Sequence, residues 1–132
     1  EGVVFTGDVL FGAGCGHIFE GTPEQMLISL DRLSSLPDET LVYFGHEYTE
    51  SNLLFARHVD PDNMDVQERQ DTLLPTTTPS RLLIEKKTNP FLRVDEDSVI
   101  EALEGHIGRK ENDRVERLRL VREWKSEFDR GR

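Results

Sequence analysis

The sequence predicts an α/β protein that continues into a helical carboxyl-terminal region. Two short apolar runs of strand type, residues 3–6 and 40–44, flank an amphipathic helical stretch. After residue 46 the strand pattern ends and helical periodicity takes over, most clearly over residues 112–129. A chain of 132 residues is also long enough to bury a core. Strand, helix and strand in this order are typical of a βαβ unit.

The helix between the two strands has clear start signals. Thr22 suits the N-cap, Pro23 the first helical position and Gln25 the third, a pattern that predicts a capping box. Apolar side chains at helical spacing predict its buried face: Met26, Leu27, Leu30 and Leu33. Before this helix lies a glycine-rich segment, residues 12–16, which allows positive φ angles or a close approach of the backbone to another group.

Two helices are expected after the second strand. Thr49 and Ser51 are the candidate N-caps of the first. The second lies near residues 64–72, inside the polar and proline-containing stretch 60–80, most of which is expected to be loop.

The last third of the chain predicts a turn and two more helices. Residues 89–93, Asn-Pro-Phe-Leu-Arg, form a compact turn with an apolar anchor. Ser98 is the candidate cap of a short helix that closes at Gly105. The helix over residues 112–129 has one continuous apolar face: Val115, Leu118, Val121, Trp124 and Phe128.

Composition and charge limit the class of partner and compartment. A net charge of -10 argues against nucleic acid and against an anionic membrane as the main partner. The single cysteine, Cys15, excludes an internal disulfide and suits a reducing compartment, so we expect the cytoplasm, with the mitochondrion as the alternative. Because the chain begins directly in a predicted strand, we expect the natural amino terminus to lie upstream.

Asp8 and His46 each follow a predicted strand closely. In α/β sheets, ligands gather at the carboxyl ends of the strands, so a carboxylate and an imidazole there are candidate metal ligands. One Asp and one His do not complete a zinc site, which needs three or four protein ligands. The structural alternative is that Asp8 caps the glycine-rich loop and that His46 is a hydrogen-bonded turn residue.

Arg122 and Lys125 are three residues apart on the last predicted helix, so they share a face. Together they are suited to binding a carboxylate, to which arginine can make two parallel hydrogen bonds. The alternative is a solvated helix with surface ion pairs such as Asp113–Arg117. Spacing alone leaves both interpretations open.

Six short motifs, taken together in order and spacing, resemble the glyoxalase II family of the metallo-β-lactamase superfamily. They are Phe5-Thr6-Gly7-Asp8, Ala13-Gly14-Cys15-Gly16, Phe19-Glu20-Gly21-Thr22, Gly45-His46-Glu47-Tyr48-Thr49, Phe55-Ala56-Arg57 and Asn89-Pro90-Phe91-Leu92-Arg93. The resemblance implies the second half of an αββα sandwich in residues 1–46. It implies a helical substrate-binding domain in residues 47–132.

The resemblance also implies a reaction and its cofactors. Members of the family hold two divalent metals, zinc or iron, and the position of Asp8 bridges them while that of His46 binds one of them. A metal-bound hydroxide attacks the thioester carbonyl of S-D-lactoylglutathione and releases D-lactate and glutathione. Asp8 and His46 are therefore the expected catalytic and metal-binding residues.

The expected substrate-binding residues are those at the family's glutathione site: His17, Phe19, Tyr48, Arg122 and Lys125. Tyr48 matches a tyrosine that binds the peptide, and the basic pair matches one that holds the glycine carboxylate. Both bases are present, which favours glutathione over trypanothione thioesters. His17 stands where the family usually has Lys or Arg, and Phe19 where some members have Tyr.

The chain departs from the family in two further respects. The T-H-x-H-x-D-H metal motif is absent, as is a later His ligand, so we expect the 132 residues alone not to assemble the dinuclear site and to be inactive. The expected partner is a missing amino-terminal half, or a second copy bound through unpaired strands. Residues 62–88 match the family poorly.

Two other functions are open. One is an inactive, truncated binding module. The other is a different enzyme of the superfamily, such as a persulfide dioxygenase, against which the long last helix with its basic pair argues.

Overall fold

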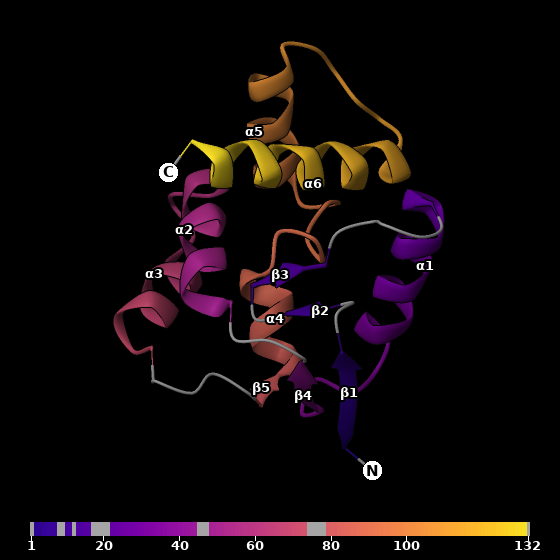
Figure 1. Ribbon diagram of the computed structural model, residues 1–132, viewed down its shortest axis with the longest axis vertical. Helices are drawn as coiled ribbons and strands as arrows, with labels where there is room; N and C mark the ends of the chain where they lie inside the picture. Colours follow the sequence, from indigo (N-terminus) through magenta and orange to yellow (C-terminus); the bar gives the residue numbers. More distant parts are fainter. Residues whose placement is uncertain are drawn as a thin grey trace.

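The computed structural model of the chain describes residues 2–7, 10–11, 13–16, 22–44, 48–73 and 79–131. These residues form a mixed α/β fold with a small sheet and a helical carboxyl-terminal region (Figure 1). The elements in chain order are β1 (Val3–Gly7), β2 (Leu10–Phe11), β3 (Gly14–Cys15), α1 (Pro23–Ser34), β4 (Leu41–Phe44), α2 (Thr49–Val59), α3 (Met64–Asp71), β5 (Ser80–Arg81), α4 (Leu82–Thr88), α5 (Asp97–Ile107) and α6 (Arg114–Arg130).

The predicted βαβ unit is confirmed. Strands β1 and β4 pair in parallel, from Val3 opposite Leu41 to Gly7 opposite Phe44, and α1 connects them. Strand β5 adds antiparallel to the other side of β4, which gives the order β1-β4-β5. Strands β2 and β3 form a separate antiparallel hairpin.

Helix α1 begins with the predicted capping box. The Thr22 hydroxyl accepts a hydrogen bond from the Gln25 amide at 3.2 Å, and the Gln25 side chain accepts one from the Thr22 amide at 3.0 Å. On the predicted apolar face, Leu27 and Leu30 are buried in the core.

We expect Thr22→Ala to lower the free energy of unfolding by about 1 kcal/mol, because the Gln25 amide at the start of α1 loses the hydroxyl that caps it. Urea unfolding followed by circular dichroism measures the change. Ser29→Ala, at an exposed site inside α1, is the control and should be neutral or slightly stabilising. Equal midpoints for the wild type and Thr22→Ala would contradict the prediction.

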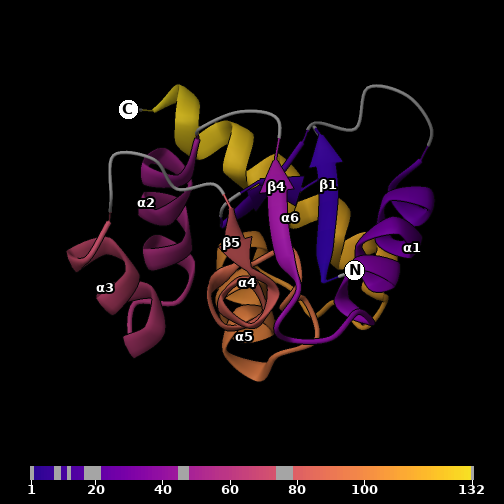
Figure 2. The same ribbon diagram turned by 90° about the horizontal axis from the view of Figure 1, so that it is seen from below.

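The helices surround the sheet and the hairpin. In Figure 1, α6 lies across the top of the molecule, with α5 above it. Helix α6 packs against α1 and α5, and α2 packs against α3, α5 and strand β3. Figure 2 shows α1 on one side of the β1–β4 pair and α2 with α3 on the other. None of the described helices is long and apolar enough to cross a membrane.

One core joins the βαβ unit to the helical region. Its most buried apolar side chains come from the hairpin, α1, β4 and the carboxyl-terminal helices: Leu10, Leu30, Val42, Phe55, Leu82, Phe91, Leu103, Leu118 and Val121. The predicted apolar face of α6 is confirmed, since Leu118, Val121 and Trp124 are buried and Val115 and Phe128 pack against them. The predicted turn at residues 89–93 is also confirmed, with Phe91 only 1% exposed.

The predicted caps of two helices are wrong. Helix α2 has Tyr48 at its N-cap, so Thr49 and Ser51 lie inside the helix. Helix α5 has Glu96 at its N-cap, and Ser98 donates a hydrogen bond to Asp60 instead, at 3.1 Å. For Ser98, a tertiary partner therefore replaced the predicted local cap.

Helix α5 also runs beyond its predicted end. Gly105 lies inside the helix, which continues to Ile107 and stops at Gly108. Gly108 has a φ of 76°, the left-handed conformation that glycine adopts most readily at a helix end. Helix α3 is where the sequence predicts a helix, whereas α4 lies in a segment where periodicity predicts none.

An arginine pair fastens α6 to its neighbours. Arg114 forms ion pairs with Asp31 of α1 and with Asp95, and Arg117 forms a second one with Asp95 at 2.8 Å. The proposed surface pair Asp113–Arg117 is thus replaced: Asp113 caps α6 by accepting from the Val115 amide at 3.0 Å. Hydrogen bonds from Arg114 hold the pKa of Asp95 below its usual value, with a smaller contribution from Arg117.

We expect Asp95→Asn to lower stability at neutral pH and to lose this effect in acid. The folded-state pKa of Asp95 is depressed, so its contribution is present above the unfolded value of about 3.9 and disappears as pH falls through the lower folded value. Urea midpoints of wild type and variant should differ at pH 7 and converge below about pH 3. Because Asp95 is half-exposed, added salt should shrink the gap. A difference between the two urea midpoints that grows as the pH falls would show that the depressed pKa of Asp95 does not stabilise the fold.

Strand β1 leaves an apolar face open within the described part of the chain. Phe5 is 78% exposed and Val3 43% exposed, and the Phe5 ring stacks on Tyr43 with centroids 5.2 Å apart. Among the described strands, β1 lies at the edge of its sheet. An exposed edge next to apolar side chains favours pairing with another chain.

We therefore expect light scattering of the purified chain to report a mass above that of the monomer, rising with concentration. Phe5→Lys should shift the population toward monomer, because a charge on an edge strand opposes pairing. A concentration-independent monomer would contradict the prediction.

Candidate functional site

The carboxyl ends of β1 and β4 lie together. Gly7 is paired with Phe44, so the two parallel strands end at the same edge of the sheet. Asp8 follows Gly7 in the sequence and His46 follows Phe44 by two residues. Both residues fall outside the described ranges, and their predicted roles stay predictions. Among the described residues, no group of three or more His, Cys, Asp or Glu side chains is arranged to hold a metal ion.

The glycine-rich segment forms the β2–β3 hairpin, which comes close to α2. Ala13 has a φ of 59°, in the left-handed region that side chains other than glycine rarely adopt. A Cβ atom at Gly14 would lie 2.5 Å from Nδ2 and 2.7 Å from Cγ of Asn52, so a side chain there would force the buried Asn52 side chain to move. The hairpin is thus packed directly against α2.

A buried carboxylate fixes the hairpin from the other side. Glu85 of α4 is fully buried and accepts a hydrogen bond from the Ala13 amide at 2.9 Å. Arg69 of α3 supplies the compensating charge at 2.8 Å, and the Ser80 hydroxyl donates to the same carboxylate at 2.7 Å. Asn89 donates both to the Gly14 carbonyl at 2.9 Å and to Glu85 at 3.2 Å.

The basic pair of α6 is buried, which excludes the alternative of a solvated surface pair. Arg122 is 7% exposed and Lys125 is 5% exposed. The Arg122 guanidinium lies over the Phe91 ring, 5.7 Å from its centroid, and Lys125 forms an ion pair with Asp129. Two cations held this far from solvent are well suited to a ligand that carries negative charge.

Both cations act on the last residue of the hairpin. Burial raises the pKa of the Cys15 thiol to about 12, and the positive charges of Arg122 and Lys125 partly oppose this shift. Cys15 is therefore a neutral, buried thiol near the basic pair, without the depressed pKa of a nucleophile.

Tyr48 is 49% exposed at the start of α2. The Asn52 amide donates to the Tyr48 carbonyl at 2.9 Å, so Tyr48 lies one helical turn from the side chain that contacts Gly14. Tyr48 thus lies near the hairpin, and its role in substrate binding stays a prediction. His17 and Phe19, the other two predicted substrate residues, lie outside the described part of the chain.

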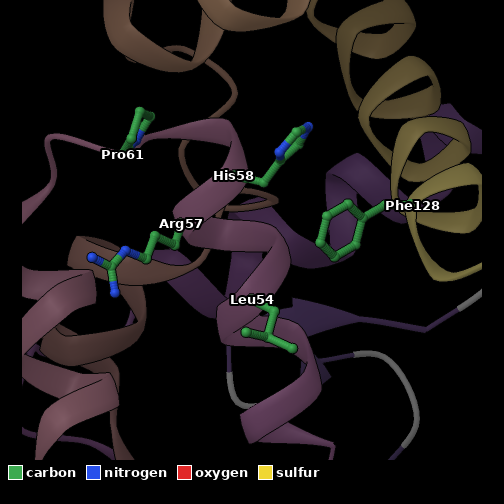
Figure 3. A pocket seen from close by; sticks show the side chains of 5 residues that line it. All are labelled: Leu54, Arg57, His58, Pro61 and Phe128. Atoms are coloured by element: carbon green, nitrogen blue, oxygen red, sulfur yellow. The ribbon is translucent and has the colours of Figure 1, made fainter. Parts of the chain in front are cut away.

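A shallow hollow lies elsewhere, between α2 and the end of α6 (Figure 3). Its volume is about 580 Å³, and it is lined by Leu54, Arg57, His58, Pro61 and Phe128. The His58 ring lies 5.0 Å from that of Phe128, between centroids. Three of the lining residues, Leu54, Arg57 and His58, follow helical spacing on one face of α2, a signal that is present in the sequence but does not point to a ligand.

The residues that hold the hairpin are the ones sequence reasoning missed: Asn52, Arg69, Glu85 and Asn89. Of these, only Asn89 belongs to a motif of the resemblance. The fold and the site together define the class of protein. It is a mixed α/β protein whose helical region holds two buried cations near a glycine-rich hairpin.

Comparisons with known proteins identify the family. A family model described as "Hydroxyacylglutathione hydrolase C-terminus" matches residues 47–128. The chain is 50% identical to the hydroxyacylglutathione hydrolase of Nitrosomonas eutropha, over 97% of the chain and 52% of that relative. It is 48% identical to that of Pseudomonas fluorescens, over 97% and 52%, and 47% identical to that of a Synechococcus species, over 97% and 50%.

The chain belongs to the hydroxyacylglutathione hydrolase family. It spans about half the length of the curated relatives it matches. The resemblance to glyoxalase II is thereby confirmed.

Proposed function

We propose that this chain works in a thioester hydrolase that cleaves hydroxyacylglutathiones, such as S-D-lactoylglutathione, to a hydroxy acid and glutathione. The observation that carries the proposal is the buried pair of Arg122 and Lys125 beside the glycine-rich hairpin. The names of the relatives, all hydroxyacylglutathione hydrolases, support the same reaction.

Glutathione matches this arrangement chemically. Its glycine end carries a carboxylate, which the guanidinium of Arg122 and the ammonium of Lys125 would bind. Charge-assisted hydrogen bonds of this kind are stronger than neutral ones, and they are strengthened by exclusion from water. Tyr48, at the start of α2, would donate a hydrogen bond from its hydroxyl to the peptide part of the substrate. In this arrangement the basic pair orients the thioester rather than reacting with it.

The metals of the family are part of the proposal. Asp8 and His46 would hold them, since the strands that precede these residues end side by side at one edge of the sheet. Two ligands fall short of the three or four that a zinc site requires, so this donor set is incomplete and needs ligands from other segments. When bound, a pair of zinc or iron ions lowers the pKa of water and polarises the thioester carbonyl. His17 and Phe19 would line the substrate side.

The same proposal includes the larger architecture. The β1-β4-β5 sheet would be part of an αββα sandwich, and its open face at Phe5 supports this. Residues 1–46 would belong to the sandwich and residues 47–132 to the substrate-binding domain. The missing half of the sandwich, or a second copy of the chain, would cover the open edge. The cytoplasm, with its reducing conditions, suits the free Cys15.

The test uses the complete translation product of the gene. Its metal content is measured by plasma mass spectrometry, and hydrolysis of S-D-lactoylglutathione is followed by loss of thioester absorbance. We expect about two metals per chain, turnover, and loss of turnover after chelation. Binding of glutathione without turnover would favour the binding module. Oxygen consumption with glutathione persulfide would favour a dioxygenase. Either result would overturn the proposal.

A further inference from the structure

We infer that Glu85 and Asn89 are positioning residues of the substrate site: their hydrogen bonds to the glycine-rich hairpin set where it stands relative to Arg122 and Lys125. This inference rests on the proposed thioester hydrolysis and adds two residues that touch neither the substrate nor the metals. Both lie in the helical region, far along the chain from the hairpin they hold.

Glu85 acts on a strained point of the hairpin. Ala13 has a positive φ, a conformation that costs a residue with a side chain on the order of 1–3 kcal/mol unless its surroundings hold it. Its amide donates to the Glu85 carboxylate at 2.9 Å, in a site with no exposure to solvent. A charged acceptor makes a stronger hydrogen bond than a neutral one, and Arg69 supplies the counter-charge. The bond therefore selects one shape of the hairpin.

Asn89 connects the hairpin to the basic pair. Its side-chain amide donates to the Gly14 carbonyl at 2.9 Å, while its side-chain oxygen accepts from the Phe91 amide at 3.0 Å. The Phe91 ring lies under the Arg122 guanidinium. A continuous series of contacts thus runs from Gly14 through Asn89 and Phe91 to Arg122.

This series has a functional consequence because the hairpin lies between the two predicted parts of the site. In the sequence it is preceded by Asp8 and followed by His17. In space, Cys15 belongs to the same core cluster as Val121 and Trp124, the neighbours of the two cations on α6. A hairpin that shifts relative to Arg122 misplaces the thioester when the carboxylate is bound. Misplacement of about 1 Å is enough to lower a rate by about 10²-fold.

The experiment compares two substrates in the complete translation product: S-D-lactoylglutathione, and its glycine methyl ester, which lacks the carboxylate. In the variants Glu85→Gln and Asn89→Ala we expect the preference for the acid, measured as a ratio of kcat/KM values, to fall about tenfold, mostly through kcat for the acid. Glu68→Gln, an exposed glutamate on neighbouring α3, is the matched control and should keep the wild-type ratio. Ser80→Ala removes one hydrogen-bond donor to Glu85 and should give a ratio between those of the wild type and Glu85→Gln. This milder variant still tests the inference if Glu85→Gln or Asn89→Ala does not fold.

The outcomes separate the two proposals. In one outcome, the wild type hydrolyses the acid, but the variants Glu85→Gln, Asn89→Ala and Ser80→Ala lose the same factor in kcat/KM for the acid and for the methyl ester. These residues are then merely structural, and the inference is wrong while the proposed function stands. If the wild type hydrolyses neither thioester, the proposed function fails and the inference fails with it. Amide hydrogen exchange at Ala13, faster in Glu85→Gln than in Glu68→Gln, is the supporting structural readout.

Discussion

Replacing Arg122 by methionine is expected to raise the KM for S-D-lactoylglutathione roughly 10- to 150-fold, with a smaller effect on kcat. The range corresponds to the loss of charge-assisted hydrogen bonds of about 1.5–3 kcal/mol. Methionine keeps most of the side-chain volume over the Phe91 ring, so the core around α6 stays filled. The increase in KM then reflects the lost positive charge rather than a change in packing. Steady-state kinetics of the complete translation product measure it.

Arg119→Met is the matched control on the same helix. Arg119 is partly exposed and pairs with Glu116 and Glu123 on the surface of α6, where ion pairs contribute little. Its KM should equal that of the wild type. An Arg122→Met enzyme with the wild-type KM for the acid would show that the buried cation does not bind the glycine carboxylate.

The largest effect on stability is expected for Arg69→Met, which should lower the free energy of unfolding by about 3–5 kcal/mol. The Arg69 side chain is 11% exposed and that of Glu85 is fully buried, with 2.8 Å between their charged atoms. Removal of the arginine leaves a buried carboxylate without its counter-charge, whereas its other donors, such as Ser80 and the Ala13 amide, are neutral. Urea unfolding measures the shift.

Arg57→Met provides the comparison for this prediction. Arg57 is an exposed residue of α2 whose guanidinium donates to Gln70 at the surface. Its substitution should change stability by no more than about 0.5 kcal/mol. If the two variants unfold at the same urea concentration, the buried pair contributes no more than a surface contact, and the account of Glu85 as the anchor of the hairpin is wrong.

Helices α1 and α6 could be predicted because their signals are local. The capping box at Thr22 and the apolar face of α6 need only the residues of the helix itself. Helix α4, by contrast, has seven residues, too few to establish a helical period. Ser98, the predicted cap of α5, donates its hydroxyl hydrogen bond to Asp60 instead, 38 residues away in the chain. No local pattern contains that partner.

The candidate site shows the same limit. Spacing places Arg122 and Lys125 on one face of a helix but does not say that the face is buried, and the alternative of a solvated helix is equally consistent with it. Spacing left a carboxylate-binding pair as one of two open interpretations, and only the resemblance to a family favoured it. Glu85 was missed because glutamate is almost never fully buried, so the sequence predicts an exposed side chain at this position. In the structure it is fully buried.

The bonds from α4 to the hairpin also have a consequence for synthesis of the protein. They join residues 72 and 75 positions apart in the chain, Ala13 to Glu85 and Gly14 to Asn89. At a translation rate of about 5–20 residues per second, the hairpin emerges several seconds before the residues that hold it. The glycine-rich segment must therefore stay unanchored on the ribosome until α4 and the turn after it have been made, which makes the anchoring of the hairpin a late event in the synthesis of the chain.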